Sequence, residues 1–221
     1  MRDILPEVVI QMLRDRYLDG VADAEAQFDN GAADEDSLTG ALGQAISIAR
    51  PLSIRVGAQS YTVQVDWRRV RGRGPNAPER LYGPDGLFQM AVFDDRGGIL
   101  RRKALPFQAK ISWNGANSDL LRQSHSLESS ISGGLVVDYS PSGYRACTTA
   151  AAVAAGGNAI EVQRARAFQS LGKTLANDFL DCTVGSIGMY FDPATERFYN
   201  GGNLLQPANA ITTVVRRRRA A

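Results

Sequence analysis

The chain has 221 residues, of which 44% are hydrophobic and 22% are charged. This composition matches ordinary soluble globular proteins and excludes disordered and fibrous classes, and the length predicts one domain over residues 1–215. The formal net charge of +2 is too small to indicate a partner. Four successive arginines predict a solvated basic C-terminal tail over residues 216–221.

The first segment, MRDILPEVVIQMLRDRY, mixes apolar and charged residues. Its charges argue against a signal peptide and a membrane-spanning helix, so no membrane partner is expected. The two cysteines, Cys147 and Cys182, lack the paired spacing of a zinc site or a redox motif. We therefore expect a reduced, cytoplasmic setting.

Two helical patterns precede a strand-like segment in the first third of the chain. Apolar residues recur at helical spacing over residues 5–17 and 38–48, and the small, acidic stretch 20–36 between them predicts a surface connection. Alternation of apolar and polar residues over 54–70 predicts a strand or hairpin, and a Gly- and Pro-containing loop follows at 71–80.

The next elements predict a sheet with helices. Residues 88–93 and 99–111 indicate two strands joined by a Gly-rich hairpin link, and 118–130 indicates a helix that ends at Gly133 and Gly134. Further elements are expected as strands at 135–139 and 144–148, a helix at 168–180, and a short hairpin at 189–191 with 197–199. This order favours an α/β fold with a mixed central β-sheet flanked by helices.

Polar residues interrupt the strand at 99–111. Gln108 and Lys110 are two residues apart and so share one face of the strand. The hairpin register places Asp85 about level with Gln108, which would bring an acid, an amide oxygen and an ammonium together. Mg²⁺ prefers oxygen ligands and commonly takes one or two carboxylates, so Asp85, Gln108 and the backbone carbonyl of Ala109 are candidate metal ligands. Lys110 would then neutralise a phosphate or orient an attacking water, as in phosphodiester hydrolysis.

Five motifs carry a resemblance to a known family: EDSLT at 35–39, ERLYGPD at 79–85, FQAK at 107–110, LLRQ at 120–123 and VVDYS at 136–140. Their order resembles that of the PD-(D/E)xK, or restriction-endonuclease-like, nucleases, and most closely the branch with a Gln-x-Lys signature. The resemblance covers residues 35–148. It implies a single restriction-endonuclease-like domain that cleaves DNA with Mg²⁺ or Mn²⁺.

The same resemblance implies roles for particular residues. Asp85 matches the metal-binding aspartate, Gln108 the second ligand position and Lys110 the catalytic lysine. Glu35 resembles an acid on the first core helix that completes the site, and Gln123 a glutamine that faces it; Glu79 is a further acid to consider. The family also suggests defence against foreign DNA. Because the sequence shows no evident sensor or target-recognition domain, we expect activation through a protein partner, a nucleotide signal or homo-oligomerisation.

Alternatives remain open. Polar alternation would also occur at a strand edge that simply faces solvent, with no active site. A second alternative is a noncatalytic nucleic-acid-binding or assembly subunit, which the neutral side chain of Gln108 favours because it weakens a metal site. A third possibility is an α/β interaction protein with no role in nucleic-acid binding. Four arginines form a candidate phosphate-binding cluster, although such a run is often only a solvated end: Arg68, Arg69, Arg71 and Arg73.

Overall fold

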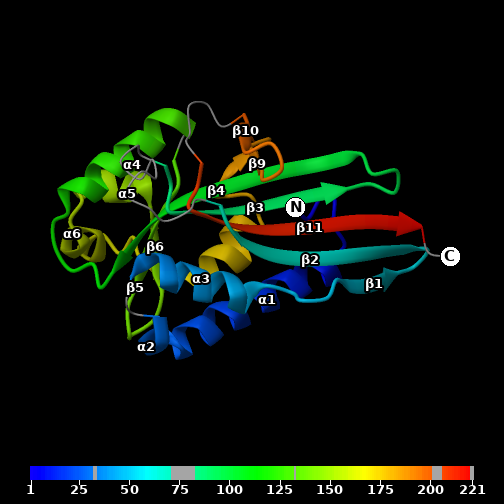
Figure 1. Ribbon diagram of the computed structural model, residues 1–221, viewed down its shortest axis with the longest axis horizontal. Helices are drawn as coiled ribbons and strands as arrows, with labels where there is room; N and C mark the ends of the chain where they lie inside the picture. The colour runs from blue at the N-terminus through cyan, green and yellow to red at the C-terminus, as the bar shows by residue number, and fades with distance from the viewer. Residues whose placement is uncertain (32–33, 71–82, 132, 201–205, 220–221) are drawn as a thin grey trace.

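A long mixed β-sheet runs through the molecule (Figure 1). The computed structural model describes residues 1–31, 34–70, 83–131, 133–200 and 206–219. Within these residues nine strands form the sheet, with β8 pairing with β4 beside the main order β1-β2-β11-β3-β4-β5-β6-β7. The strands are β1 (Leu52–Val56), β2 (Gln59–Arg69), β3 (Gly86–Phe93), β4 (Ile99–Ile111), β5 (Leu135–Tyr139), β6 (Arg145–Thr148), β7 (Gln169–Ser170), β8 (Ser186–Ile187) and β11 (Asn209–Arg219).

The sheet is mixed because two of its neighbouring pairs are parallel. Strand β11 runs parallel to β3, and β4 runs parallel to β5, whereas the other pairs are antiparallel. A separate antiparallel hairpin is formed by β9 (Tyr190–Asp192) and β10 (Arg197–Tyr199). The predicted α/β class with a mixed central sheet is confirmed.

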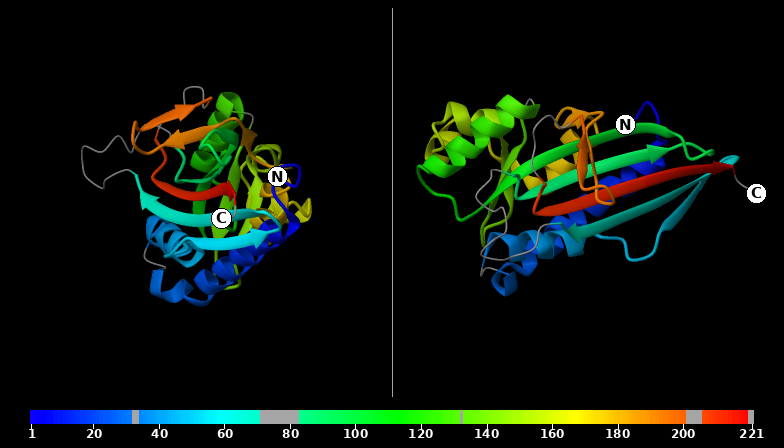
Figure 2. Two further views of the ribbon diagram at one scale, coloured as in Figure 1. Left: turned by 90° about the vertical axis from the view of Figure 1, so that its right-hand side faces the viewer. Right: turned by 45° about the horizontal axis from the view of Figure 1, so that its top comes forward.

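Helices cover both faces of the sheet. The helical segments are α1 (Glu7–Ala26), α2 (Phe28–Gly31), α3 (Glu35–Ile46), α4 (Ser118–Ile131), α5 (Thr149–Ala154), α6 (Ala159–Arg164), α7 (Leu171–Lys173) and a π-helical turn, η1 (Thr174–Phe179). Apolar residues of α1, α3, α7 and η1 share the largest core cluster with the sheet. Residues of α4, α5 and α6 contribute to a second cluster, and the end of α4 with β9 to a third. Figure 2 shows the green and yellow-green helices α4, α5 and α6 together at one end of the sheet.

Helix α1 continues to Ala26, whereas the predicted helix ended at residue 17. The prediction of a surface connection over residues 20–36 is therefore wrong for residues 20–26. Gly20, Val21 and Ala24 are buried, which continues the apolar stripe of α1 by about two turns beyond Tyr17. A Cβ atom at Gly20 would lie 2.9 Å from the Cα of Ile46 in α3, so glycine allows the close approach of the two helices. Of the two acids in this part of the helix, Asp23 is exposed, whereas Glu25 is half-buried and accepts a hydrogen bond from the backbone N–H of Tyr144 at 2.7 Å.

The predicted hairpin at 88–111 is confirmed. Strands β3 and β4 pair antiparallel, with Gly86 opposite Phe107, and a register shift occurs near Phe93. Asp94 holds the turn because its side chain accepts hydrogen bonds from the backbone N–H groups of Arg96 at 2.9 Å and Gly98 at 2.7 Å. Because Gly86 pairs with Phe107, the hairpin places Asp85, the residue before β3, beside the end of β4.

Two other predictions are corrected. The arginines at 216–219 are not a solvated tail: they form the end of β11, where Arg216 pairs with Thr62 of β2 and with Phe93 of β3. The helix predicted from residue 168 begins only at Leu171, after the short strand β7, and changes to π-helical geometry at Thr174. Among the described helices, none is both long and apolar enough to cross a membrane.

Candidate active site

Asp85 lies directly before β3, beside the end of β4. One carboxylate oxygen, Oδ2, accepts a hydrogen bond from the backbone N–H of Ala109 at 2.8 Å. The ring of Phe107 packs over Gly86, where a Cβ atom would overlap it, and stacks on Phe88 with centroids 4.8 Å apart. The structure thus brings Asp85 to the level of the Gln-x-Lys segment, as the hairpin register predicts.

Lys110 reaches from β4 to the first residue of α3. Its ammonium lies 3.3 Å from Oε1 of Glu35 and donates a hydrogen bond to the carbonyl oxygen of Ala109 at 2.6 Å. Asp34 caps α3 by accepting a hydrogen bond from the backbone N–H of Ser37 at 2.7 Å, which fixes where the helix starts. The cap therefore positions Glu35 at the site.

The charges of the site shift the pKa of Glu35 in opposite directions. Burial raises the pKa of Glu35, the nearby charge of Asp85 raises it further, and the charge of Lys110 opposes both effects. Two acids thus influence one another while a single ammonium lies between α3 and β4. A divalent cation at this point would relieve the repulsion between the carboxylates.

Buried residues around the acids hold the local structure, and sequence reasoning did not identify them. Asn209, at the start of β11, is 2% exposed and donates hydrogen bonds to the backbone oxygen of Asp85 at 3.2 Å and to Oδ1 of Asp36 at 3.5 Å. Its own oxygen accepts a hydrogen bond from the Trp67 indole at 3.3 Å. The available signal was a lone asparagine at the start of an apolar, β-branched run.

Tyr139 forms a second support on β5. Its hydroxyl lies 3.1 Å from Oγ1 of Thr39 in α3, and both side chains are buried. Burial raises the pKa of Tyr139, and the negative charges of Asp85 and Glu35 contribute in the same direction. Tyr139 is therefore a neutral hydrogen-bonding group beside the acids.

The two glutamines of the predicted site lie in a different environment. Gln108 is 1% exposed, and it pairs with Val136, which packs with Leu120 of α4 in the second core cluster. The side-chain oxygens of Gln108 and of Gln123 on α4 are buried and have no hydrogen-bond partner among the residues that the structure describes. Within the described part of the chain, no hydrogen bond joins either glutamine to Asp85, Glu35 or Lys110, so the roles of the two glutamines stay predictions.

The donor set is compatible with a hard cation. Asp85 and Glu35 offer carboxylate oxygens, and Gln108 offers an amide oxygen that is buried without a described partner. The carbonyl oxygen of Ala109 accepts a hydrogen bond from Lys110, which uses one of its two lone pairs. No group of three or more His, Cys, Asp or Glu that could hold a metal occurs in the described parts of the chain. Substrate or water oxygens would therefore have to complete the coordination.

The predicted arginine cluster is only partly described. Arg69 forms an ion pair with Asp36 of α3 at 2.7 Å, and Arg68 is exposed on β2. Arg71, Arg73 and the acid Glu79 lie outside the described residues. Arg69 therefore lies near the acids of α3, and the wider cluster stays a prediction.

The fold defines an α/β protein with a large mixed sheet and a partly buried polar site at one end of its central strands. No family model, curated protein or solved structure matches the chain. Any functional assignment must therefore come from the chemistry of the residues.

Proposed function

We propose that this protein is a metal-dependent nuclease of the restriction-endonuclease-like fold that hydrolyses phosphodiester bonds in DNA. One observation carries the proposal. Asp85, Lys110 and Glu35 come from three separate segments, and they meet where β4 ends: Asp85 binds the backbone beside Lys110, and Lys110 pairs with Glu35. Two carboxylates can hold a cation, and an amine beside them can stabilise charge on a phosphate, so this set suits cation-assisted hydrolysis of a phosphate ester.

Each of these residues has a distinct role in the proposed mechanism. Asp85 and Glu35 would hold Mg²⁺ or Mn²⁺, and the amide oxygen of Gln108 is a candidate further ligand. The bound ion would supply Lewis-acid stabilisation of the charge that develops on the phosphate. The Lys110 ammonium would bind a phosphate oxygen or orient the attacking water, and Asn209 would position Asp85 through its backbone oxygen.

A lysine variant provides the decisive test. Lys110→Ala is expected to lower Mg²⁺-dependent cleavage of DNA at least about 100-fold, because a group that stabilises developing charge is typically worth that much. Lys173→Ala is the matched control, since this lysine is exposed on α7. Undiminished cleavage by a folded Lys110→Ala protein would refute the site.

A noncatalytic nucleic-acid-binding subunit is the second candidate. It is favoured by the contacts of Lys110, which is already engaged by Glu35 and the Ala109 carbonyl, and by the neutral side chain of Gln108. Binding measured at rising salt, with and without Mg²⁺ or Mn²⁺, separates the two functions. Binding without cleavage under every metal condition supports the subunit, and failure to bind DNA or RNA at low salt supports an interaction protein instead.

The resemblance also motivates proposals about biological context. From that resemblance we propose defence against foreign DNA, and we propose with it activation by a protein partner, a nucleotide signal or self-association. Addition of candidate activators to the cleavage assay tests these proposals directly. Cleavage that is already maximal for the isolated protein would argue against a required activator.

A further inference from the structure

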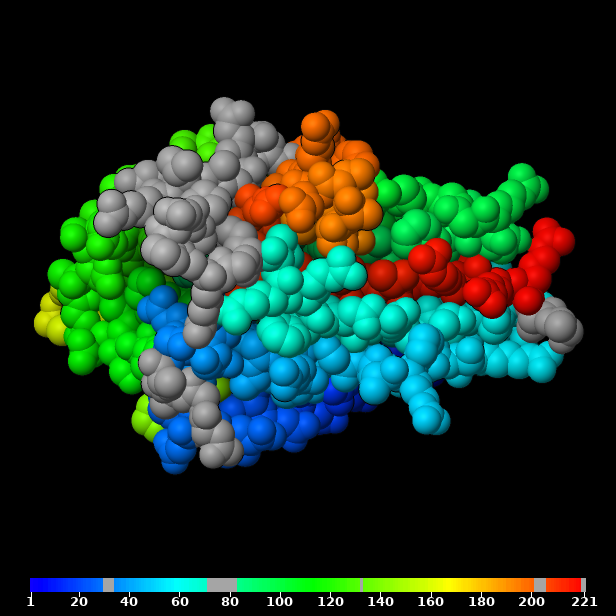
Figure 3. Space-filling model, viewed as in Figure 1, coloured from blue at the N-terminus to red at the C-terminus, as the bar shows by residue number. Residues whose placement is uncertain are grey.

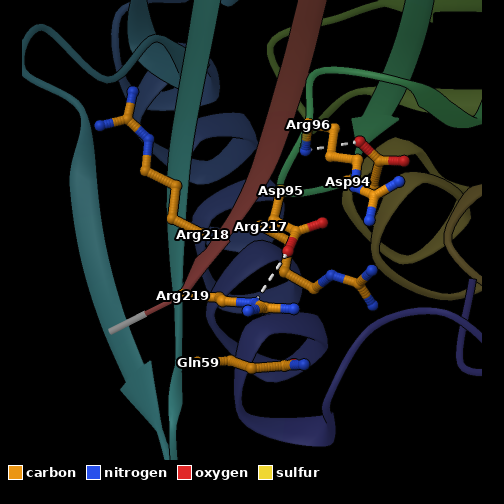
Figure 4. A pocket seen from close by; sticks show the side chains of 7 residues that line it. All are labelled: Gln59, Asp94, Asp95, Arg96, Arg217, Arg218 and Arg219. Atoms are coloured by element: carbon orange, nitrogen blue, oxygen red, sulfur yellow. Dashed lines mark hydrogen bonds and ion pairs between the residues drawn. The ribbon is translucent and has the colours of Figure 1, made fainter. Parts of the chain in front are cut away.

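Arginines gather at the end of the sheet that lies opposite the candidate active site. This group, which we term the arginine tip, comprises Arg96 in the β3–β4 turn and Arg216–Arg219 at the end of β11. A pocket of about 360 Å³ opens there (Figure 4), lined by Gln59, Asp94, Asp95, Arg96, Arg217, Arg218 and Arg219. Arginines outnumber acids in this lining, so the pocket is positively charged.

The arginines do not all point the same way. Arg217 and Arg219 are two residues apart on a strand, and Figure 4 shows both extending toward Asp95 and Arg96, whereas Arg218 extends to the other side of β11. Arg219 pairs with Asp95 at 3.3 Å, but its side chain is 87% exposed. Asp95 can neutralise only part of this charge, and exposed guanidinium groups in such a group suit phosphate oxygens.

A polar surface connects the tip with the opposite end of the sheet. The outward side chains of β2 and β11 are half-buried or exposed, and Figure 3 shows these two strands open to solvent on one face. Arg68 is exposed near one end of this face, and Arg216 and Arg218 are exposed at the other. Asp66 is an exposed acid between them.

The distance between the candidate active site and the arginine tip is close to the length of one helical turn of DNA. Strand β11 begins at Asn209, which contacts the backbone of Asp85, and ends at Arg219. Ten steps at roughly 3.3 Å each separate these residues by about 33 Å. One turn of duplex DNA advances about 34 Å, which returns the same strand to the same side of the helix.

We propose that the arginine tip, through Arg216 and Arg218, binds backbone phosphates of a DNA duplex that lies along the exposed face of β2 and β11, one helical turn from the candidate active site. This inference rests on the proposed function, or on its nucleic-acid-binding alternative, for the identity of the ligand. The arginine tip would be a second DNA-binding surface besides the candidate active site, so the affinity would depend on the length of the duplex. A duplex too short to reach both ends gains nothing from the tip.

Binding to duplexes of different length tests the inference without any cleavage. In EDTA, the wild-type protein is expected to bind a 24-base-pair duplex at least about tenfold more tightly than an 8-base-pair duplex, because only the longer one reaches the tip. Arg216→Gln/Arg218→Gln, which changes the two arginines of the tip on the exposed face, is expected to lose this gain and to reduce the salt dependence of binding to the longer duplex by about 1.8 in log–log slope. Equal binding of the two duplexes by the wild-type protein would overturn the inference.

Two further variants guard against an effect on folding. Arg217→Gln/Arg219→Gln changes only the opposite side of β11 and is expected to leave binding of the longer duplex unchanged, whereas Asp66→Asn is expected to strengthen it by removing a repelling charge. Arg164→Ala is the matched control, because this exposed arginine of α6 also pairs with one acid, Glu161. The inference is wrong if either Arg217→Gln/Arg219→Gln or Arg164→Ala weakens binding as much as Arg216→Gln/Arg218→Gln.

The two proposals fail separately. Loss of the length effect with Lys110-dependent cleavage intact rejects the tip and leaves the nuclease. A length effect that persists while Lys110→Ala cleaves normally, or while no cleavage occurs with any metal, rejects the catalytic site and leaves the tip.

Discussion

Two charged pairs lie on neighbouring strands, and their surroundings differ. Lys110 of β4 stands in register with Asp138 of β5, and each forms an ion pair with a residue from another element. Lys110 meets Glu35 at 3.3 Å, with side chains 15% and 37% exposed. Asp138 is fully buried, and its two oxygens accept hydrogen bonds from the Trp113 backbone at 2.7 Å and from Arg145 at 2.8 Å.

The Asp138–Arg145 pair is held by more contacts than the Lys110–Glu35 pair. The guanidinium of Arg145 also donates to the carbonyl of Trp113 at 3.2 Å and lies 4.1 Å from the ring centroid of Phe168. Each partner is therefore held by several elements, and a ligand could enter only by breaking them. The Lys110–Glu35 contact is longer and partly exposed, so a phosphate or a cation can replace it at low cost.

The largest expected effect is on stability, at the buried pair. Asp138→Ala should lower the free energy of unfolding by about 3–5 kcal/mol, because it leaves Arg145 and the Trp113 N–H without their partner. Urea denaturation of the variant and the wild type measures the loss. The double variant Asp138→Ala/Arg145→Met should recover part of it, and a single-variant loss below about 1 kcal/mol would contradict the comparison.

The candidate site should show the opposite behaviour. Glu35→Gln should change the free energy of unfolding by less than about 1 kcal/mol, because the pair is partly exposed and Lys110 keeps its bond to the Ala109 carbonyl. The same variant should lose metal-dependent cleavage if Glu35 holds the cation. A large loss of stability in Glu35→Gln would place this residue with the structural pair instead.

The sequence predicts the hairpin elements well because local signals determine them. The Gly-rich turn after Asp94 and the alternation on both sides specify β3 and β4, and this register alone brings Asp85 beside Ala109. The contact between Glu35 and Lys110 joins residues 75 positions apart and was expected only from the resemblance. Local patterns carry no information about such a contact.

The central strand β11 shows why the rest could not be predicted. Its apolar half is short, and four arginines follow it, so its composition indicates a solvated end. The strand forms because β2 and β3 provide hydrogen-bonding partners on both sides, which no local pattern records. For the same reason Asn209 was missed, since its role depends on Trp67 and Asp85, which are distant in the sequence.

The smallest expected effect is in the pH dependence of stability. Because the pKa of Glu35 is raised in the folded protein by burial, the native state binds its proton more tightly than the unfolded chain does. At a pH well below 4.5, the ordinary pKa of a glutamate, Glu35 is protonated in both the native and the unfolded state. Its ionisation, which burial makes unfavourable in the native state, therefore lowers stability only as the pH rises above 4.5. The stability of the wild type minus that of Glu35→Gln should therefore fall between about pH 4.5 and neutrality and then level off. Solvent screening at this half-exposed side chain should keep the change below about 1 kcal/mol. Chemical denaturation at pH values from 4 to 8 measures it, and a difference that instead rises with pH would show that the attraction of Lys110 outweighs burial.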